Sequence, residues 1–160
     1  MQNIHLIVVG KIKEKYFTDA IKEYSKRLGR YCNLTIAEVK DEPTPDNPSE
    51  REIELVLEKE AERIEAKIPK GAYLIPLCIE GKQLDSIDFA DLFRQTANEG
   101  RSDVAFVIGG SLGIHDRIKQ RAEFKLSFSK MTFPHQLMRV VLLEQIYRAF
   151  NINNGGKYHK

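Results

Sequence analysis

The chain alternates short apolar runs with longer amphipathic segments, and this alternation limits its fold more than any other feature. Residues 4–9, 34–39, 73–79, 104–108 and 126–128 are apolar runs of strand length. The run at 104–108 is apolar throughout, as is typical of a strand buried on both faces. The segments between most of these runs carry apolar residues three and four positions apart. The pattern predicts an α/β fold with a mostly parallel sheet of five to six strands and helices on both faces.

The amphipathic segments predict four helices, over residues 13–28, 50–68, 86–100 and 134–152. Ser49 and Glu52 have the spacing of a capping box before the second helix, and Ser86 is expected to cap the third. Residues 41–49 contain three prolines, which exclude both a helix interior and a central strand, so a loop is expected there. No break in composition divides the chain, which predicts a single domain over residues 1–160.

The expected last helix is apolar over most of its circumference. Its polar side is a narrow strip formed by Arg139, Glu144 and Arg148. A helix that is apolar nearly all round must be buried nearly all round. One side can face the sheet, and we expect the other to face a second copy of the chain. The helix therefore predicts a homodimer.

Charge is unevenly distributed along the chain. The net charge of +2, from 25 basic and 23 acidic residues, does not by itself indicate a nucleic-acid partner. However, residues 115–160 carry nine basic against three acidic residues, and residues 11–30 carry seven against three. Residues 50–67 carry seven glutamates against four basic residues. This distribution favours a basic side that meets phosphates, with an ordinary mixed surface as the alternative.

Several classes of protein are disfavoured. No apolar run approaches the roughly 20 residues that span a bilayer, and the N-terminus lacks the pattern of a secretory signal, so a cytoplasmic protein is expected. Cys32 and Cys78 lack C-x-x-C spacing and are interpreted as small buried hydrophobes. The four histidines are scattered, and no metal site is predicted.

A glycine-rich turn, IGGSLG, follows the apolar run at 104–108. It lacks the G-x-G-x-x-G order of a dinucleotide fingerprint, and no G-x-x-x-x-G-K-[ST] occurs, so nicotinamide and triphosphate chemistry lose their best support. Gly109, Gly110 and Gly113 permit positive φ and a backbone close to a flat ligand. The alternative is that these three glycines form a tight turn that binds no ligand.

A second loop, residues 129–135, has the sequence SKMTFPH. A connection between a strand and a buried helix is usually short and polar, whereas this one carries Met, Phe and Pro. Apolar side chains beside free backbone groups suit an adenine, whose faces need hydrophobic cover and whose edge needs one or two hydrogen bonds. His135 is either a general base or a cap and packing residue. The terminal KYHK is either a frayed end or a lid that presents Tyr158, His159 and Lys160 to RNA.

The segments FVIGGSLGIH and LSFSKMTFPHQLMRVVLLEQIYRAF, with the terminal KYHK, resemble the ribosomal RNA large subunit methyltransferase H family, a minimal group of SPOUT methyltransferases. The resemblance runs from the opening VVGKIKEKY to the last residue. It implies an obligate homodimer and a trefoil knot within about residues 104–152. It also implies S-adenosylmethionine-dependent N3-methylation of a pseudouridine in 23S ribosomal RNA, with the assembled ribosome as substrate. The Asn-Asn-Gly-Gly sequence itself predicts a flexible basic tail over 153–160.

The resemblance also implies the residues of the site. The implied cofactor-binding residues are Leu77, Gly109, Phe128, Ser129, Lys130, Met131, Thr132 and Phe133. The N3 proton of pseudouridine must leave before or during transfer, which requires a base or a field that favours the anion. We expect His159, Tyr158, Arg139 and Arg148 to act as base, to position the target and to stabilise charge. The alternatives are a non-catalytic ribosome- or RNA-binding protein of the same fold and, disfavoured by the missing fingerprint, a nucleotide-dependent oxidoreductase.

Overall fold

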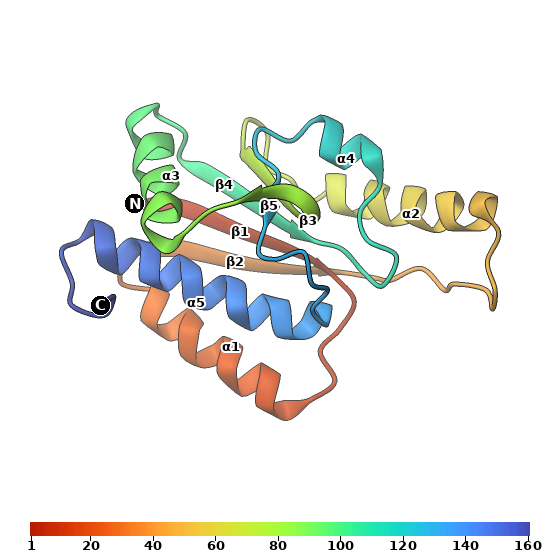
Figure 1. Ribbon diagram of the computed structural model, residues 1–160, viewed down its shortest axis with the longest axis horizontal. Coiled ribbons are helices and arrows are strands. Elements are labelled where there is room, and N and C mark those ends of the chain that lie inside the picture. The colour runs from red at the N-terminus through yellow and green to blue at the C-terminus, as the bar shows by residue number, and fades with distance from the viewer.

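Five strands form one sheet in the order β2-β1-β4-β3-β5, and every neighbouring pair is parallel (Figure 1). The computed structural model describes residues 1–160. The strands are β1 (Gln2–Val9), β2 (Cys32–Val39), β3 (Tyr73–Gln83), β4 (Asp103–Ile108) and β5 (Leu126–Ser127). The helices are α1 (Lys15–Leu28), α2 (Glu50–Glu65), α3 (Ser86–Asn98), α4 (Asp116–Gln120) and α5 (His135–Asn153). The predicted parallel α/β fold is confirmed.

The two faces of the sheet bury two separate hydrophobic clusters. Side chains alternate between the faces along a strand. In β1, Leu6 and Val8 therefore join the cluster under α1, α3 and α5, whereas Ile7 and Val9 join the cluster under α2 and α4. Figure 1 shows α1 and α5 together on one side of the sheet and α2 and α4 on the other. The expectation of helices on both faces is thus confirmed.

Because all strands are parallel, their carboxyl ends lie at one edge of the sheet. The loops that follow β1, β2 and β4 open at this edge. Strand β3 pairs with β4 only from Tyr73 to Pro76, so Leu77 lies just beyond the last pair. Ligands of open α/β sheets bind in crevices at such an edge.

Three local expectations are corrected. Strand β3 does not end at Ile79, as the apolar run 73–79 indicated, but continues to Gln83. A Cβ at Gly81 would lie 2.7 Å from the carbonyl oxygen of Lys125, so this close crossing requires glycine. Asp85 caps α3 in place of Ser86, because the Asp85 carboxylate accepts a hydrogen bond from the amide of Asp88 at 2.7 Å. Helix α4 was not expected, because its five residues are too few to show periodicity. The capping box of Ser49 and Glu52 is confirmed.

Helix α5 packs against the sheet and is flanked by α1 and α3. Leu142, Ile146 and Ala149 are fully buried against these neighbours. Leu137, Val140 and Val141 are half-buried, and no residue of α5 is exposed. Much of the apolar character of the helix therefore serves the core of one chain, and the homodimer stays a prediction. None of the helices combines the length and apolarity that crossing a membrane requires.

Candidate functional site

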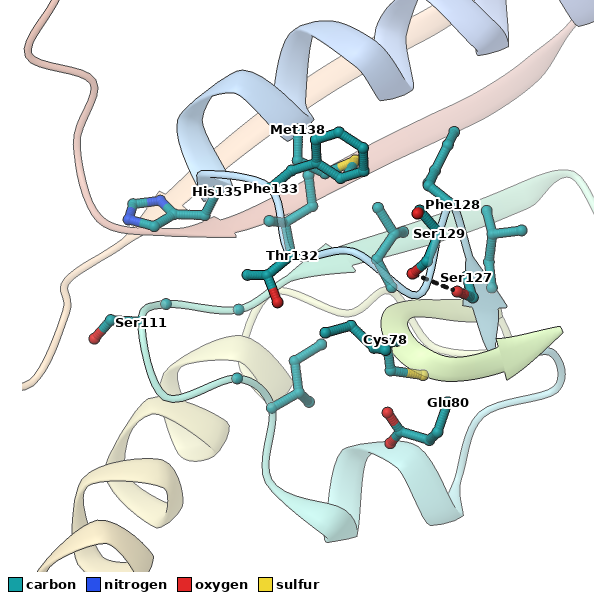
Figure 2. Close-up of a pocket in the computed structure, with 18 of the residues that line it drawn as sticks. Cys78, Glu80, Ser111, Ser127, Phe128, Ser129, Thr132, Phe133, His135 and Met138 are labelled. Atoms are coloured by element: carbon teal, nitrogen blue, oxygen red, sulfur yellow. Dashed lines mark hydrogen bonds between the residues drawn. The ribbon is translucent and has the colours of Figure 1, made fainter. Parts of the chain in front are cut away.

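A pocket opens at the carboxyl edge of the sheet, where β4, β3 and β5 end (Figure 2). It encloses about 350 Å³. Its walls come from residues 77–80 of β3, the glycine turn 109–114, and the segment 126–133 with the start of α5. These segments are distant in the sequence, and the strand order β4-β3-β5 brings them together. The volume lies within the range of small-molecule sites.

Most of the expected cofactor-binding residues lie in this wall. The pocket is lined by Leu77, Gly109, Phe128, Ser129, Met131, Thr132 and Phe133. Lys130 is exposed and does not line it. Leu77 had no signal of its own in the sequence beyond the resemblance, because a leucine at the end of an apolar run is also an ordinary core residue.

The glycine turn is held in shape by its own backbone. The amide of Gly113 donates to the carbonyl of Gly110 at 3.1 Å, and Gly113 has φ +90°. A Cβ on Gly109 would collide with the carbonyl of Gly113. Any side chain at either position would therefore open the turn and displace this wall of the pocket.

The loop 128–133 offers free backbone groups beside apolar side chains. None of its residues takes part in a backbone–backbone hydrogen bond. Two side chains shape it instead: the Ser127 hydroxyl donates to the carbonyl of Ser129 at 3.1 Å, and the Ser129 hydroxyl accepts from the amide of Met131 at 3.0 Å. The remaining amides and carbonyls are free to bind the edge of a flat heterocycle, with Met131 and Phe133 available to cover its faces.

A charged pair lies at one edge of the pocket. Glu80 accepts a hydrogen bond from the ammonium of Lys119 at 2.6 Å, and this contact lowers the pKa of the Glu80 carboxyl. Burial raises the pKa of the neighbouring Cys78 thiol, so the thiol stays protonated at neutral pH. Figure 2 shows Cys78 and Glu80 close together, on the other side of the pocket from His135. Here the pocket offers an ionised acceptor for ligand hydroxyl groups.

His135 forms the opposite side of the pocket near Ser111 (Figure 2). Burial, and next the charge of Arg139, lower the pKa of its imidazole, which keeps the ring neutral at pH 7. The buried Nδ1 atom has no hydrogen-bond partner. A neutral ring is able to accept a proton, and the same contacts also fit a packing residue.

The tail folds back onto the last turns of α5 and forms a second cluster. Glu144 accepts hydrogen bonds from the Arg148 guanidinium at 2.8 Å and from the Tyr158 hydroxyl at 2.9 Å. Burial, and next the hydrogen bond to Glu144, raise the pKa of Tyr158. Tyr158 therefore stays protonated at neutral pH, is a poor base, and has its hydroxyl hydrogen engaged by Glu144.

Arg148 also fixes the orientation of His159. The two atoms Arg148 Nη1 and His159 Nδ1 are 3.1 Å apart. A guanidinium only donates hydrogen bonds, so Nδ1 accepts and Nε2 carries the ring hydrogen. In this arrangement His159 presents a donor to a ligand. Glu144, which joins the members of this cluster, was missed at the sequence level because an acidic residue on a polar strip is usually only solvated.

The cluster and the pocket lie at opposite ends of α5. His135 borders the pocket, and Arg148 follows it by 13 positions. At a rise of 1.5 Å per residue this is about 20 Å along the helix axis. Figure 1 shows the C-terminus at the end of α5 remote from the loop that precedes the helix. Within one chain, the structure does not bring Arg148, Tyr158 and His159 to the pocket.

Arg139 lies in neither group. Its side chain is 1% exposed, and its guanidinium binds Glu38 at 2.7 Å and the carbonyl of Gly10 at 2.8 Å. A weaker bond of 3.3 Å joins it to the carbonyl of Val9. These contacts anchor the loop after β1 to α5, so in this chain Arg139 positions backbone and does not line the pocket. No group of three or more His, Cys, Asp or Glu side chains is placed to hold a metal ion.

Comparisons with known proteins agree with this architecture. Residues 2–159 match the family described as "Predicted SPOUT methyltransferase". The chain is 57% identical over 158 residues to the ribosomal RNA large subunit methyltransferase H of Clostridium beijerinckii and 54% identical to that of Clostridium novyi, with 99% of both chains covered in each case. Among solved structures, it resembles a probable methylase family protein from Haemophilus influenzae Rd KW20, with a TM-score of 0.58, 12% identity, and 99% of this chain and 71% of that chain covered.

Proposed function

The chain belongs to the SPOUT methyltransferase family, and from this premise we propose that it methylates ribosomal RNA with S-adenosylmethionine as the methyl donor. The observation that carries the proposal is the pocket at the carboxyl edge of β4, β3 and β5, whose lining includes Leu77, Gly109 and most of the loop 128–133. The relatives that match along the whole chain carry the name of a ribosomal RNA methyltransferase.

The residues of the pocket fit this cofactor. The unpaired backbone groups of the loop 128–133 suit the edge of an adenine, and Leu77 and Phe133 supply apolar cover. Glu80, kept ionised by Lys119, suits the hydroxyls of a ribose. S-adenosylmethionine, when bound, supplies a methyl group carried by a sulfonium, and the sulfur leaves as a neutral thioether without a metal. The protein has to hold the acceptor in line with that methyl group and exclude water.

For the finer specificity we propose N3 of a pseudouridine in 23S ribosomal RNA within the assembled ribosome. This nitrogen lies between two carbonyls and becomes nucleophilic once it has lost its proton to bulk water, a loss that a field favouring the anion promotes. The positive charge of Arg148 favours the resulting anion, and the Nε2–H of His159 is a donor suited to a flanking carbonyl oxygen. The Tyr158 hydroxyl donates to Glu144 and helps to hold this cluster against α5. Because ribosomes are the proposed substrate, we propose that the protein acts in the cytoplasm.

The separation of pocket and tail supports a homodimer in which the two parts act together across the subunit boundary. About 20 Å separates them within one chain, so the tail of one subunit would complete the pocket of the other. The half-buried side chains Leu137, Val140 and Val141 of α5 supply apolar surface for this contact. A trefoil knot within residues 104–152 remains part of the proposal by family resemblance.

Mixed dimers test this arrangement. Thr132→Trp would fill the pocket from an exposed loop, and Arg148→Ala would disable the tail cluster. Each homodimer should be inactive, whereas a co-expressed, tag-purified mixed dimer should retain one intact site and about half of the wild-type rate. A mixed dimer as inactive as its parents, with normal cofactor binding at the Arg148→Ala subunit, would show that the two parts do not act across the boundary.

Calorimetry separates the enzyme from its alternatives. Titration with S-adenosylmethionine should release heat with one site per subunit, and Thr132→Trp should abolish the signal, whereas NADH should give none. Binding of ribosomes without any binding of S-adenosylmethionine would favour the non-catalytic RNA-binding protein.

A further inference from the structure

A second cavity adjoins the cofactor pocket at the same edge of the sheet. It encloses about 760 Å³ and is lined by the loops that follow β1, β2 and β4, together with Gln136 of α5. The strand order places the two cavities side by side. The second lies over β2-β1-β4, and the first lies over β4-β3-β5. In Figure 1 the chain leaves β1, β2 and β4 toward the same side of the molecule.

The two cavities share one wall. Gly110, Ser111 and His135 line both of them. The glycine turn after β4 and the first residue of α5 therefore separate a largely apolar pocket from a polar one. A ligand in the second cavity lies directly beside the site of methyl transfer, on the other side of residues that the cofactor pocket also uses.

The charges of the second cavity favour an anion, because two of its four acids are paired with basic residues of the chain whereas its lysines are not. Glu38 pairs with Arg139, and Glu42 pairs with Arg63 and Lys59. The hydrogen bond from Arg63 lowers the pKa of the Glu42 carboxyl. Arg63 and Lys59 are residues of α2, so the Glu42 carboxylate is paired with this helix.

Glu60 is buried and accepts the amide of Glu42 at 2.9 Å. Burial raises the pKa of its carboxyl. Asp41 is the remaining acid of the lining, and it is exposed without an ion pair.

The basic residues of the lining are free, by contrast. Lys11, Lys13 and Lys40 are exposed and form no ion pair. Lys11 and Lys13 come from the loop after β1 and Lys40 from the loop after β2, so lysines line the cavity from two adjacent loops. The backbone amide of Lys13 is held by the side chain of Gln136 at 3.4 Å, which ties the first of these loops to α5.

We propose that this second cavity binds the sugar–phosphate backbone of the RNA next to the target nucleotide, with phosphates held by Lys11, Lys13 and Lys40. The inference rests on the proposed function, since it assigns the cavity to the same substrate. Three lysines without ion pairs, lining a cavity over neighbouring strands, suit the phosphates of a strand that enters the active site. The turn at Gly110 and Ser111 then directs the next nucleotide into the cofactor pocket.

A pair of matched variants tests the cavity. Lys11→Gln with Lys40→Gln removes two charges from it, and Lys67→Gln with Lys70→Gln removes two unpaired, exposed charges near the end of α2. Affinity for ribosomes purified from a strain lacking the modification is measured by fluorescence between about 50 and 200 mM salt. Two lost contacts to a single strand should lower the slope of log affinity against log salt by about 1.4, and the affinity at 0.15 M salt by about 15-fold.

Three results support the inference together. The cavity variant shows the lower slope with an unchanged calorimetric affinity for S-adenosylmethionine, the control variant behaves as the wild type, and Lys11→Arg with Lys40→Arg restores both slope and affinity. A cavity variant with the wild-type slope overturns the inference while the proposed function stands. A wild-type protein that transfers no methyl group to these ribosomes would overturn the proposed function itself, whatever the slopes are.

Discussion

Replacement of Arg139 by alanine should destabilise the fold far more than it affects any contact with a ligand. The change removes a buried ion pair with Glu38 and two hydrogen bonds to the carbonyls of Val9 and Gly10. Breaking a buried pair costs about 3–5 kcal/mol. Because the Glu38 side chain is 41% exposed and regains water, we expect the lower end, about 3 kcal/mol.

Urea unfolding at one fixed protein concentration measures this cost. With an m value of about 2 kcal/mol/M, the midpoint should fall by about 1.5 M. Arg148→Ala is the matched control: its guanidinium and the partner Glu144 are partly exposed, at 24% and 19%, so the free energy of unfolding should fall by less, about 1–2 kcal/mol. At temperatures where both variants are folded, Arg148→Ala should lower the rate of methyl transfer more than Arg139→Ala does.

The reasoning fails if Arg139→Ala keeps the wild-type midpoint but loses affinity for ribosomes. That result would mean that the guanidinium leaves its buried contacts to reach RNA, as the sequence alone had suggested.

Three further outcomes are expected. Glu60→Gln should raise the free energy of unfolding at pH 7 and have little effect at pH 4. Burial raises the folded-state pKa of Glu60 above its ordinary value of 4.5, so the folded chain binds the proton more tightly, and stability falls as pH rises from 4.5 through the folded-state pKa. Urea titrations at the two pH values measure the effect, and equal effects at both would contradict the reasoning. Tyr158→Phe should lower kcat and leave the calorimetric affinity for S-adenosylmethionine unchanged; a loss of cofactor affinity instead would place the hydroxyl in cofactor binding. Gly109→Ala should weaken cofactor binding, because its Cβ would collide with the carbonyl of Gly113; unchanged affinity would show that the turn adapts.

Much of the fold follows from the sequence because its elements have strong local signals. The continuous apolar run of β4 and the capping box at Ser49 each indicate their element without long-range information. The five residues of α4 carry no such signal. The extension of β3 past Gly81 depends on the close approach of the chain at Lys125, which is a tertiary contact between residues 44 positions apart in the sequence.

The parts of the candidate site that lie in a loop of unusual composition could be predicted from the sequence. The parts that depend on contacts between distant residues could not. The loop 128–133 has an unexpected content of Met and Phe, and the structure places most of it in the pocket wall. Arg139 looks like any other basic residue of α5 in the sequence, and its burial against the end of β1 depends on tertiary contacts. The second cavity is formed by three separate loops, so no single segment indicates it.

Transfer of a labelled methyl group from S-adenosylmethionine is the most direct test of the proposed activity. The acceptors are assembled ribosomes that lack the modification, free 23S ribosomal RNA and isolated large subunits, each with the wild-type protein and with Thr132→Trp. We expect label in the RNA of assembled ribosomes, at N3 of a single pseudouridine, and none with the variant. The absence of label from all three acceptors, with a wild-type protein that is folded, would contradict the assignment of this chain as a ribosomal RNA methyltransferase.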